Sequence, residues 1–181
     1  MTGVSIRPYQ LNDAEELYQA AKESVAEVQP FLPWCHPEYM IDEARSWIQF
    51  QVEQFRLGKE YQFVIAAAGG KFLGGCGLNA IDRENRRANL GYWIRSSESR
   101  RGAATAATRL LVSWAFDNTE LNRLEIVVSI VNIASLRVAE KAGAVREGTL
   151  RNRFLLHGFA HDAAVFSFVR KDFESRSSLQ D

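Results

Sequence analysis

The sequence predicts a mixed α/β (α+β) fold, and three observations support this prediction. Segments with strand and helix periodicity follow one another in the order β-α-α-β-β-β-α-β-α-β-β. Three of the strands are separated only by short turns, which is typical of an antiparallel meander. The 181-residue chain has no internal repeat or linker, so we expect one domain over residues 1–172 and a disordered tail over residues 173–181.

The N-terminal third is expected to hold one strand and two helices. The strand is expected over residues 4–7 and ends at Pro8, the first helix is capped by Asn12 or Asp13, and the second helix runs from Asp42 to Gly58. Between the helices, residues 29–37 contain three prolines and two aromatic residues. This composition predicts an ordered, non-helical loop.

The rest of the chain supplies the meander and two further helices. Strands are expected over residues 61–68, 72–79, 88–95, 124–129 and 163–169 and from Val145 onward. A helix of small and apolar residues opens at Gly102, and a shorter helix over residues 132–142 is closed by Gly143. Residues 174–181 are polar and rich in serine, which is why we expect the tail to be disordered.

Composition excludes several classes of function. Lys plus Arg and Asp plus Glu both number 22, so the formal net charge is zero and direct nucleic-acid binding is not expected. No apolar run approaches the length of a membrane span, and no signal-peptide pattern is present, so we expect a cytoplasmic protein. Cys35 and Cys76 have no partners at metal-binding spacing, so we expect reduced, largely buried thiols and no metal site.

Residues 99–104, Ser-Arg-Arg-Gly-Ala-Ala, predict an anion-binding helix start. The first turn of a helix carries unsatisfied N–H groups and a partial positive charge. Gly102 lets a ligand approach the backbone, and Arg100 and Arg101 suit a phosphate-rich ligand. An ordinary helix start with solvated arginines explains the same residues. The segment is neither a Walker loop nor a dinucleotide fingerprint.

The whole arrangement resembles the GNAT superfamily of acyl-CoA-dependent N-acyltransferases. In that family a Gln/Arg-x-x-Gly-x-Gly/Ala loop holds the pyrophosphate of coenzyme A; here Gly102 and Ala104 match, and Ser99 departs from the pattern. The resemblance is closer to the RimJ/RimL-type branch, which acetylates N-terminal amines of ribosomal proteins. It covers residues 6–170, and the matching segments are Phe31–Trp34, Glu43-Ala44, Leu90–Ile94, Asn132-x-x-Ser135, Ala139–Ala144, Glu147-Gly148 and Asp162.

This resemblance implies a fold, a cofactor and a set of site residues. The implied fold is a mixed, mostly antiparallel, twisted sheet of six to seven strands with about four flanking helices, splayed between the fourth and fifth strands. Acetyl-CoA is the implied cofactor, bound by Trp93, Ile94, Arg100, Arg101, Gly102, Ala103, Ala104, Thr105 and Asn132. The amine acceptor, for which a protein N-terminus is one candidate, would contact Phe31, Trp34, Asn79 and Tyr92, with Gln62 nearby.

The resemblance also suggests one catalytic residue. Ser135 is the candidate donor of a proton to the departing thiolate, because the helix over residues 133–142 lacks the tyrosine that many relatives use. Ser135 can equally be a first-turn serine without a chemical role. Asn132 also has two interpretations. The resemblance implies that it hydrogen-bonds to the pantetheine arm, but asparagine is also favoured at this position as a helix cap.

No side chain is an obvious general base. Asn89 and Phe154 stand where many relatives and some ribosomal-type relatives, respectively, have a glutamate. Other titratable groups lie in loops, where a surface role is expected: Glu84, Glu98, His157 and His161. Deprotonation at pH 7 costs about 1 kcal/mol for an α-amine of pKa near 8 but about 4–5 kcal/mol for a lysine, so a site without a base favours an N-terminal amine.

Two other functions fit parts of the same pattern. A non-catalytic acyl-CoA sensor would keep the anion-binding helix start and lose the chemistry, which agrees with the missing acids. A small-molecule amine acetyltransferase is the second alternative, although acids near the acceptor loop are sparse for a polyamine pocket: Glu38, Asp42, Glu43 and Glu60. The sequence leaves the oligomeric state open between a monomer and a homodimer.

Overall fold

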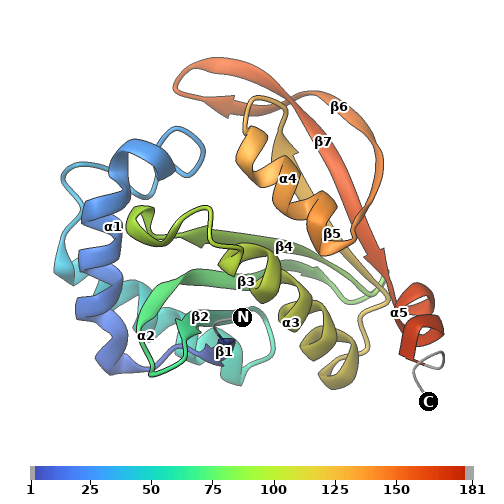
Figure 1. The fold of residues 1–181 in the computed structure, drawn as a ribbon, viewed down its shortest axis with the longest axis horizontal. Helices are drawn as coiled ribbons and strands as arrows, with labels where there is room; N and C mark the ends of the chain where they lie inside the picture. The colour runs from blue at the N-terminus through green and yellow to red at the C-terminus, as the bar shows by residue number, and fades with distance from the viewer. Residues whose placement is uncertain (1–2, 178–181) are drawn as a thin grey trace.

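The computed structural model describes residues 3–177, with side chains described up to residue 173 (Figure 1). Its strands are β1 (Val4–Pro8), β2 (Tyr61–Ala67), β3 (Phe72–Asp82), β4 (Arg87–Ile94), β5 (Arg123–Ser129), β6 (Val145–Leu156) and β7 (Phe159–Val169). Its helices are α1 (Ala14–Val28), α2 (Ile41–Arg56), α3 (Ala103–Asn118), α4 (Ile133–Ala142) and α5 (Arg170–Ser177). Two 3-10 turns, Leu11–Asp13 and Ser96–Glu98, precede α1 and α3.

The strands form one mixed sheet in the order β1-β2-β3-β4-β5-β7-β6. Every neighbouring pair is antiparallel except β4 and β5, which run parallel. The parallel pairing is short, because only residues 87–89 of β4 pair with residues 123–125 of β5. Beyond Asn89 the two strands separate, and β4 then pairs only with β3 and β5 only with β7. The expected mostly antiparallel sheet, splayed between the fourth and fifth strands, is therefore confirmed.

The helices cover both faces of the sheet and produce two cores. On β2, Phe63 and Ile65 pack in the core that α3 shares, whereas Val64 and Ala66 pack in the core of α1 and α2. This alternation follows from the two-residue period of a strand. In Figure 1 helices α3 and α4 lie in front of the sheet, on the opposite face from α2. Among the described residues, no helix is long and apolar enough to span a membrane.

The structure moves several element boundaries. Strand β3 continues past residue 79 to Asp82 through an irregularity at Ala80, whose φ is 48°. Helix α5 occupies residues 170–177, so the tail predicted over 173–181 begins inside a helix; residues 178–181 lie outside the described part. The Arg170 guanidinium secures the start of α5 by donating to the backbone carbonyls of Phe116, Thr119 and Leu121 at 2.6–3.1 Å.

Candidate functional site

A cavity of about 770 Å³ lies where β4 and β5 part. One wall is β4 from Asn89 to Trp93, and another is β5 from Ile126 to Ser129. The remaining walls come from the loop between α1 and α2, the inner face of α2, strands β2, β3 and β6, and the start of α4. The sequence-predicted residues that line it are Phe31, Trp34, Gln62, Asn79, Tyr92, Trp93, Asn132 and Ser135. Residues 100–105 and Ile94 do not line it.

The splay leaves backbone groups available along one edge of β4. Strand β3 occupies the other edge as far as Ile94, which pairs with Gly74. On the β5 side the ladder stops at Asn89. Backbone amides and carbonyls of an unpaired strand edge can bind an extended ligand as a missing strand would. Arg95 N donates to Leu73 O of β3, so the alternation of a strand turns the main-chain groups of Ile94 toward the open edge and those of Trp93 toward β3. The predicted main-chain role therefore suits Ile94, and it does not require the Ile94 side chain to enter the cavity.

The predicted anion-binding segment begins α3, a few residues after β4 ends. Gly102 occupies the cap position with a φ of +82°, and no atom lies within 4 Å of the place that a Cβ would take there. The amides of Ala103, Ala104 and Thr105 belong to the first helical turn, so they have no intrahelical acceptor. Arg101 is exposed and bonded to Glu98 at 2.9 Å. The helix start is therefore open to a ligand.

Two hydroxyl groups meet on the α4 side of the cavity. Ser135 Oγ donates to Tyr92 Oη at 3.0 Å, and Tyr92 Oη in turn donates to the Ser135 carbonyl at 3.0 Å. Burial raises the pKa of Tyr92 to about 12, so the phenol stays protonated at neutral pH. Asn132 Oδ1 accepts a hydrogen bond from Ser135 N at 3.1 Å, so Asn132 caps α4. This cap fixes the first turn of α4, to which Ser135 belongs.

Aromatic side chains hold the α1–α2 loop over the open end of the cavity. The Trp34 ring packs edge-on against Trp93 of β4 at 5.3 Å and against Tyr39 at 5.6 Å between centroids. Trp34 still has 37% of its surface exposed, so it remains available to a ligand. Below the loop, Asn89 Nδ2 donates to Asn79 Oδ1 at 2.9 Å, and both side chains line the cavity.

The four loop residues considered as bases do not line this cavity. Glu98 instead bonds Lys71 and Arg101, and His157 Nε2 lies 3.2 Å from the Gln29 carbonyl. Phe154 does line the cavity, but its ring cannot accept a proton. Glu84 and His161 contribute nothing to the cavity walls.

The cavity also contains polar groups that the sequence did not identify. Among the described residues, three buried side-chain polar atoms have no hydrogen-bond partner: Tyr9 Oη, Gln51 Oε1 and Ser129 Oγ. All three residues line this one cavity, and each is 5–6% exposed. An unsatisfied buried polar atom costs about 1–3 kcal/mol, so its retention requires an explanation such as a ligand. Spacing along the chain could not reveal this group, because Tyr9, Gln51 and Ser129 are far apart in sequence and line one cavity only in the folded protein.

Glycines make room for the polar floor of the cavity. A Cβ on Gly75 would lie 2.6 Å from Tyr9 Oη and 2.8 Å from Trp93 Nε1, and a Cβ on Gly77 would lie 2.1 Å from Gln62 Oε1. A side chain at either glycine would therefore displace these neighbours. At Gly91, in contrast, no atom lies within 4 Å of the Cβ position, so the space above β4 is open.

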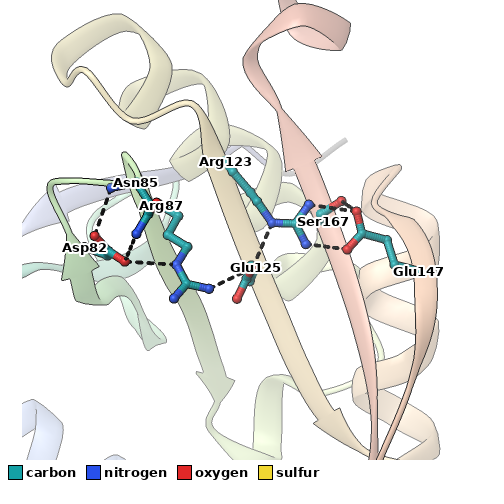
Figure 2. Close-up of polar contacts among 7 residues, drawn as sticks. All are labelled: Asp82, Asn85, Arg87, Arg123, Glu125, Glu147 and Ser167. Carbon is teal, nitrogen blue, oxygen red and sulfur yellow. Dashed lines mark hydrogen bonds and ion pairs between the residues drawn. The ribbon is translucent and has the colours of Figure 1, made fainter.

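The closed end of the same two strands carries a continuous row of ion pairs (Figure 2). Arg87 of β4 binds Asp82 at 3.2 Å, and its guanidinium lies 3.8 Å from Glu125 of β5. Arg123 of β5 binds Glu125 at 2.8 Å and reaches across β7 to Glu147 at the edge of the sheet. The guanidinium of Arg123 and the hydroxyl of Ser167 lower the pKa of Glu147 to about 2. The row therefore ties five strands together directly below the splay.

Comparisons with known proteins agree with this geometry. A family model described as acetyltransferase (GNAT) domain matches residues 4–145. YdaF of Bacillus subtilis (strain 168), provisionally named a ribosomal N-acetyltransferase, is 35% identical over 105 residues, which cover 58% of this chain and 57% of YdaF. The ribosomal-protein-serine acetyltransferase of Escherichia coli (strain K12) is 25% identical over 158 residues, covering 87% of this chain and 88% of that protein. A solved structure of RimL, a ribosomal L7/L12 alpha-N-protein acetyltransferase in complex with coenzyme A, has the same fold, with a TM-score of 0.86 at 22% identity over 93% of this chain and 95% of that chain.

Proposed function

Because this chain belongs to the acetyltransferase (GNAT) domain family, we propose that it transfers an acetyl group from acetyl-CoA to the N-terminal α-amine of a protein. The observation that carries this proposal is the separation of β4 and β5 beyond Asn89, which opens a cavity with hydroxyl groups at its side and an exposed helix start beyond it. Relatives named for the acetylation of ribosomal proteins support a protein N-terminus as the acceptor.

The residues present fit coenzyme A. The unpaired edge of β4 offers the main-chain groups of Ile94 to the pantetheine arm, Trp93 lines the cavity beside it, and the amide of Asn132 lies across the splay. The diphosphate suits the first-turn amides of Ala103 to Thr105, because Gly102 leaves their approach open. Arg100 and Arg101 add positive charge at the surface.

Acetyl-CoA supplies the acetyl group as a thioester, which a neutral amine attacks as the carbon–nitrogen bond forms and the carbon–sulfur bond breaks. The sulfur then needs a proton, and the Ser135–Tyr92 hydroxyl pair is placed to donate one. Ser135 Oγ can give up its proton directly, or Tyr92 Oη can give up its proton and draw one from Ser135 Oγ, which donates to it; water then restores the lost proton. The Ile94 amide on the free strand edge can stabilise the negative charge that develops on the carbonyl oxygen.

The acceptor must lose a proton with little help from the protein. Asn79 and Asn89 bond to each other on the cavity floor and cannot act as bases at neutral pH. An α-amine is already neutral in a useful fraction at pH 7, whereas a lysine amine is not. Water held by the two amides can carry the proton away. This reasoning favours the N-terminal amine over a lysine.

The test is acetylation of matched peptides, followed by mass spectrometry. The protein and acetyl-CoA are incubated with a peptide that has a free N-terminus and an internal lysine, and with the same peptide blocked at its N-terminus. We expect one acetyl group on the α-amine of the first peptide and none on the second. Acetylation of the blocked peptide at lysine would contradict the acceptor assignment. Binding of acetyl-CoA without acetylation of any amine would favour a sensor.

A further inference from the structure

One part of the cavity, lined by Gln51 of α2 and by Glu60 just before β2, contains a hydrogen-bond acceptor in a fixed orientation. This part is called the recess below. Gln51 Nε2 donates to Glu60 Oε2 at 3.1 Å. Because a carboxylate can only accept, this bond fixes the orientation of the Gln51 amide. Gln51 Oε1 is therefore the atom left over, and it is buried without a donor. A ligand that satisfies it must bring an N–H or O–H group.

Glu60 adds negative charge to this recess. Its carboxylate lines the cavity, and in the part of the chain that the structure describes no cationic side chain lies within ion-pair distance of it. The other cavity carboxylate is already occupied, because Glu43 accepts from Met40 N at 2.8 Å and lies 3.3 Å from His36 Nε2. The cavity guanidinium, Arg153, belongs to β6, beyond β5 and β7 in the sheet order. Glu60 is thus the acid that remains without a cation.

The walls of the recess suit a cation that carries several donors. The Tyr9 ring packs edge-on against Trp47 at 5.0 Å between centroids, and both rings line the cavity. Aromatic faces attract ammonium and guanidinium groups, the more so where water is excluded. Tyr9 Oη is unpaired and buried in the same cavity, so it can also accept a hydrogen bond.

We propose that Gln51, Glu60 and Tyr9 form a subsite for a second, cationic group of the acceptor, separate from the amine that is acetylated. This inference rests on the proposed amine acetylation. Strand register places the subsite across the sheet from the splay, because Gln62 pairs with Gly77 and Gly77 pairs with Gly91. Two strand spacings make this separation about 10 Å. An extended peptide advances about 3.4 Å per residue, so the second or third side chain of a protein N-terminus reaches it. A long diamine is the other source of the same chemistry.

The experiment compares acceptors that differ only in charge. Two peptides with a free α-amine carry either arginine or its neutral isostere citrulline as the third residue. We expect kcat/KM to be at least tenfold higher for the arginine peptide with the wild-type protein. In Glu60→Gln, which keeps a partner for Gln51 and removes the charge, the ratio should fall to near one. Glu53→Gln removes a charge from the solvent side of α2 and should keep the wild-type ratio. An equal rate for both peptides in the wild type, or an unchanged ratio in Glu60→Gln, would overturn the proposal.

A binding measurement keeps the subsite testable without turnover. Calorimetric titration compares 1,8-diaminooctane with octylamine, in the wild type and in Glu60→Gln. We expect the wild type to bind the diamine at least tenfold more tightly and the variant to bind both alike. Equal binding by the wild type would remove the subsite, whatever the protein acetylates. If no amine is acetylated but the diamine binds selectively, the proposed function fails and the subsite stands. Acetylation of the diamine alone would identify a small-molecule acceptor.

Discussion

The two ends of the β4–β5 junction differ in whether their polar side chains have partners. At the closed end, Arg87 and Arg123 each contact two carboxylates, and the charges form one connected row (Figure 2). In the cavity at the open end, which reaches across the sheet to α2, the described part of the chain leaves polar atoms of Tyr9, Gln51 and Ser129 without hydrogen-bond partners. The same pair of strands thus supports a structural network below the splay and an unsatisfied binding cavity above it. The difference indicates that the closed end holds the strands together, whereas the open end leaves room for a ligand.

The largest expected effect is on catalysis at the open end. Ser135→Ala removes one of the paired hydroxyls, and we expect kcat to fall by about 100-fold or more, the lower range for loss of a proton donor. Affinity for acetyl-CoA should stay nearly unchanged, because the splay and the helix start are untouched. Steady-state kinetics and calorimetry measure the two quantities. Tyr92→Phe should give a similar loss; unchanged turnover in Ser135→Ala would remove Ser135 from the mechanism.

A second substitution fills the open end without disturbing packing. Gly91→Val places its side chain in space where no atom lies within 4 Å of the Cβ position. We expect kcat/KM for the acceptor to fall by about tenfold, the loss that corresponds to roughly 1.4 kcal/mol of binding. The melting temperature should change little. Full activity in this variant would show that the acceptor does not pass over β4.

At the closed end we expect a loss of stability. Arg123→Met keeps an unbranched apolar stem but leaves Glu125 and Glu147 without their shared cation. Each partly exposed ion pair contributes at most about 1 kcal/mol, so the free energy of unfolding should fall by about 1–2 kcal/mol. Urea denaturation measures this change. A variant as stable as the wild type would mean that the row is not what holds the strands together.

The same row predicts a pH dependence. The pKa of Glu147 is lowered to about 2 in the folded protein, from about 4.3 in an unfolded chain. Its stabilising contribution is therefore complete above pH 4.3 and is lost as the pH falls toward 2. In Arg123→Met this part of the acid-induced loss should shrink, which chemical denaturation at a series of acidic pH values can follow. Identical pH curves for both proteins would contradict the assignment.

The smallest expected effect is a slight gain in stability instead of a loss. Tyr9→Phe removes an unpaired hydroxyl from the open end and keeps the ring that contacts Trp47. Because no hydrogen bond is lost, the free energy of unfolding should stay constant or rise, by up to about 1 kcal/mol. Thermal denaturation tests this. A clear loss of stability would show that Tyr9 has a structural partner, and the contrast between the two ends would weaken.

Local patterns predicted much of this molecule, and long-range packing supplied the rest. Gly102 and the small residues after it identify the open helix start from sequence alone, because the motif is contiguous. The start of helix α5 depends on distant contacts, those of Arg170 with the end of α3 and the residues after it. The Ser135–Tyr92 bond joins α4 to β4, so spacing along the chain does not reveal it.

In the site, too, the sequence predicted some features, whereas others depend on long-range packing. The sequence identified the family, which the comparison confirms, and the loop residues Phe31 and Trp34 that it singled out do line the cavity. It did not identify Gln51, which alone looks like one polar residue on the inner face of a helix. The proposed role of Gln51 depends on two facts: its amide nitrogen donates to Glu60, and its amide oxygen has no donor among the described residues. Such a role is visible only when hydrogen-bond partners are assigned in three dimensions.

The most direct test of the central claim is calorimetric titration with acetyl-CoA of the wild type, Gly102→Val and Gly69→Val. Both glycines have a positive φ, +82° and +90°, and open space at the Cβ position, so the two substitutions impose a similar backbone strain. Only Gly102 begins the helix that follows the splay. We predict that the wild type and Gly69→Val bind acetyl-CoA alike and that Gly102→Val binds it at least tenfold more weakly. Equal binding by all three proteins, or no binding by the wild type, would contradict the proposed function.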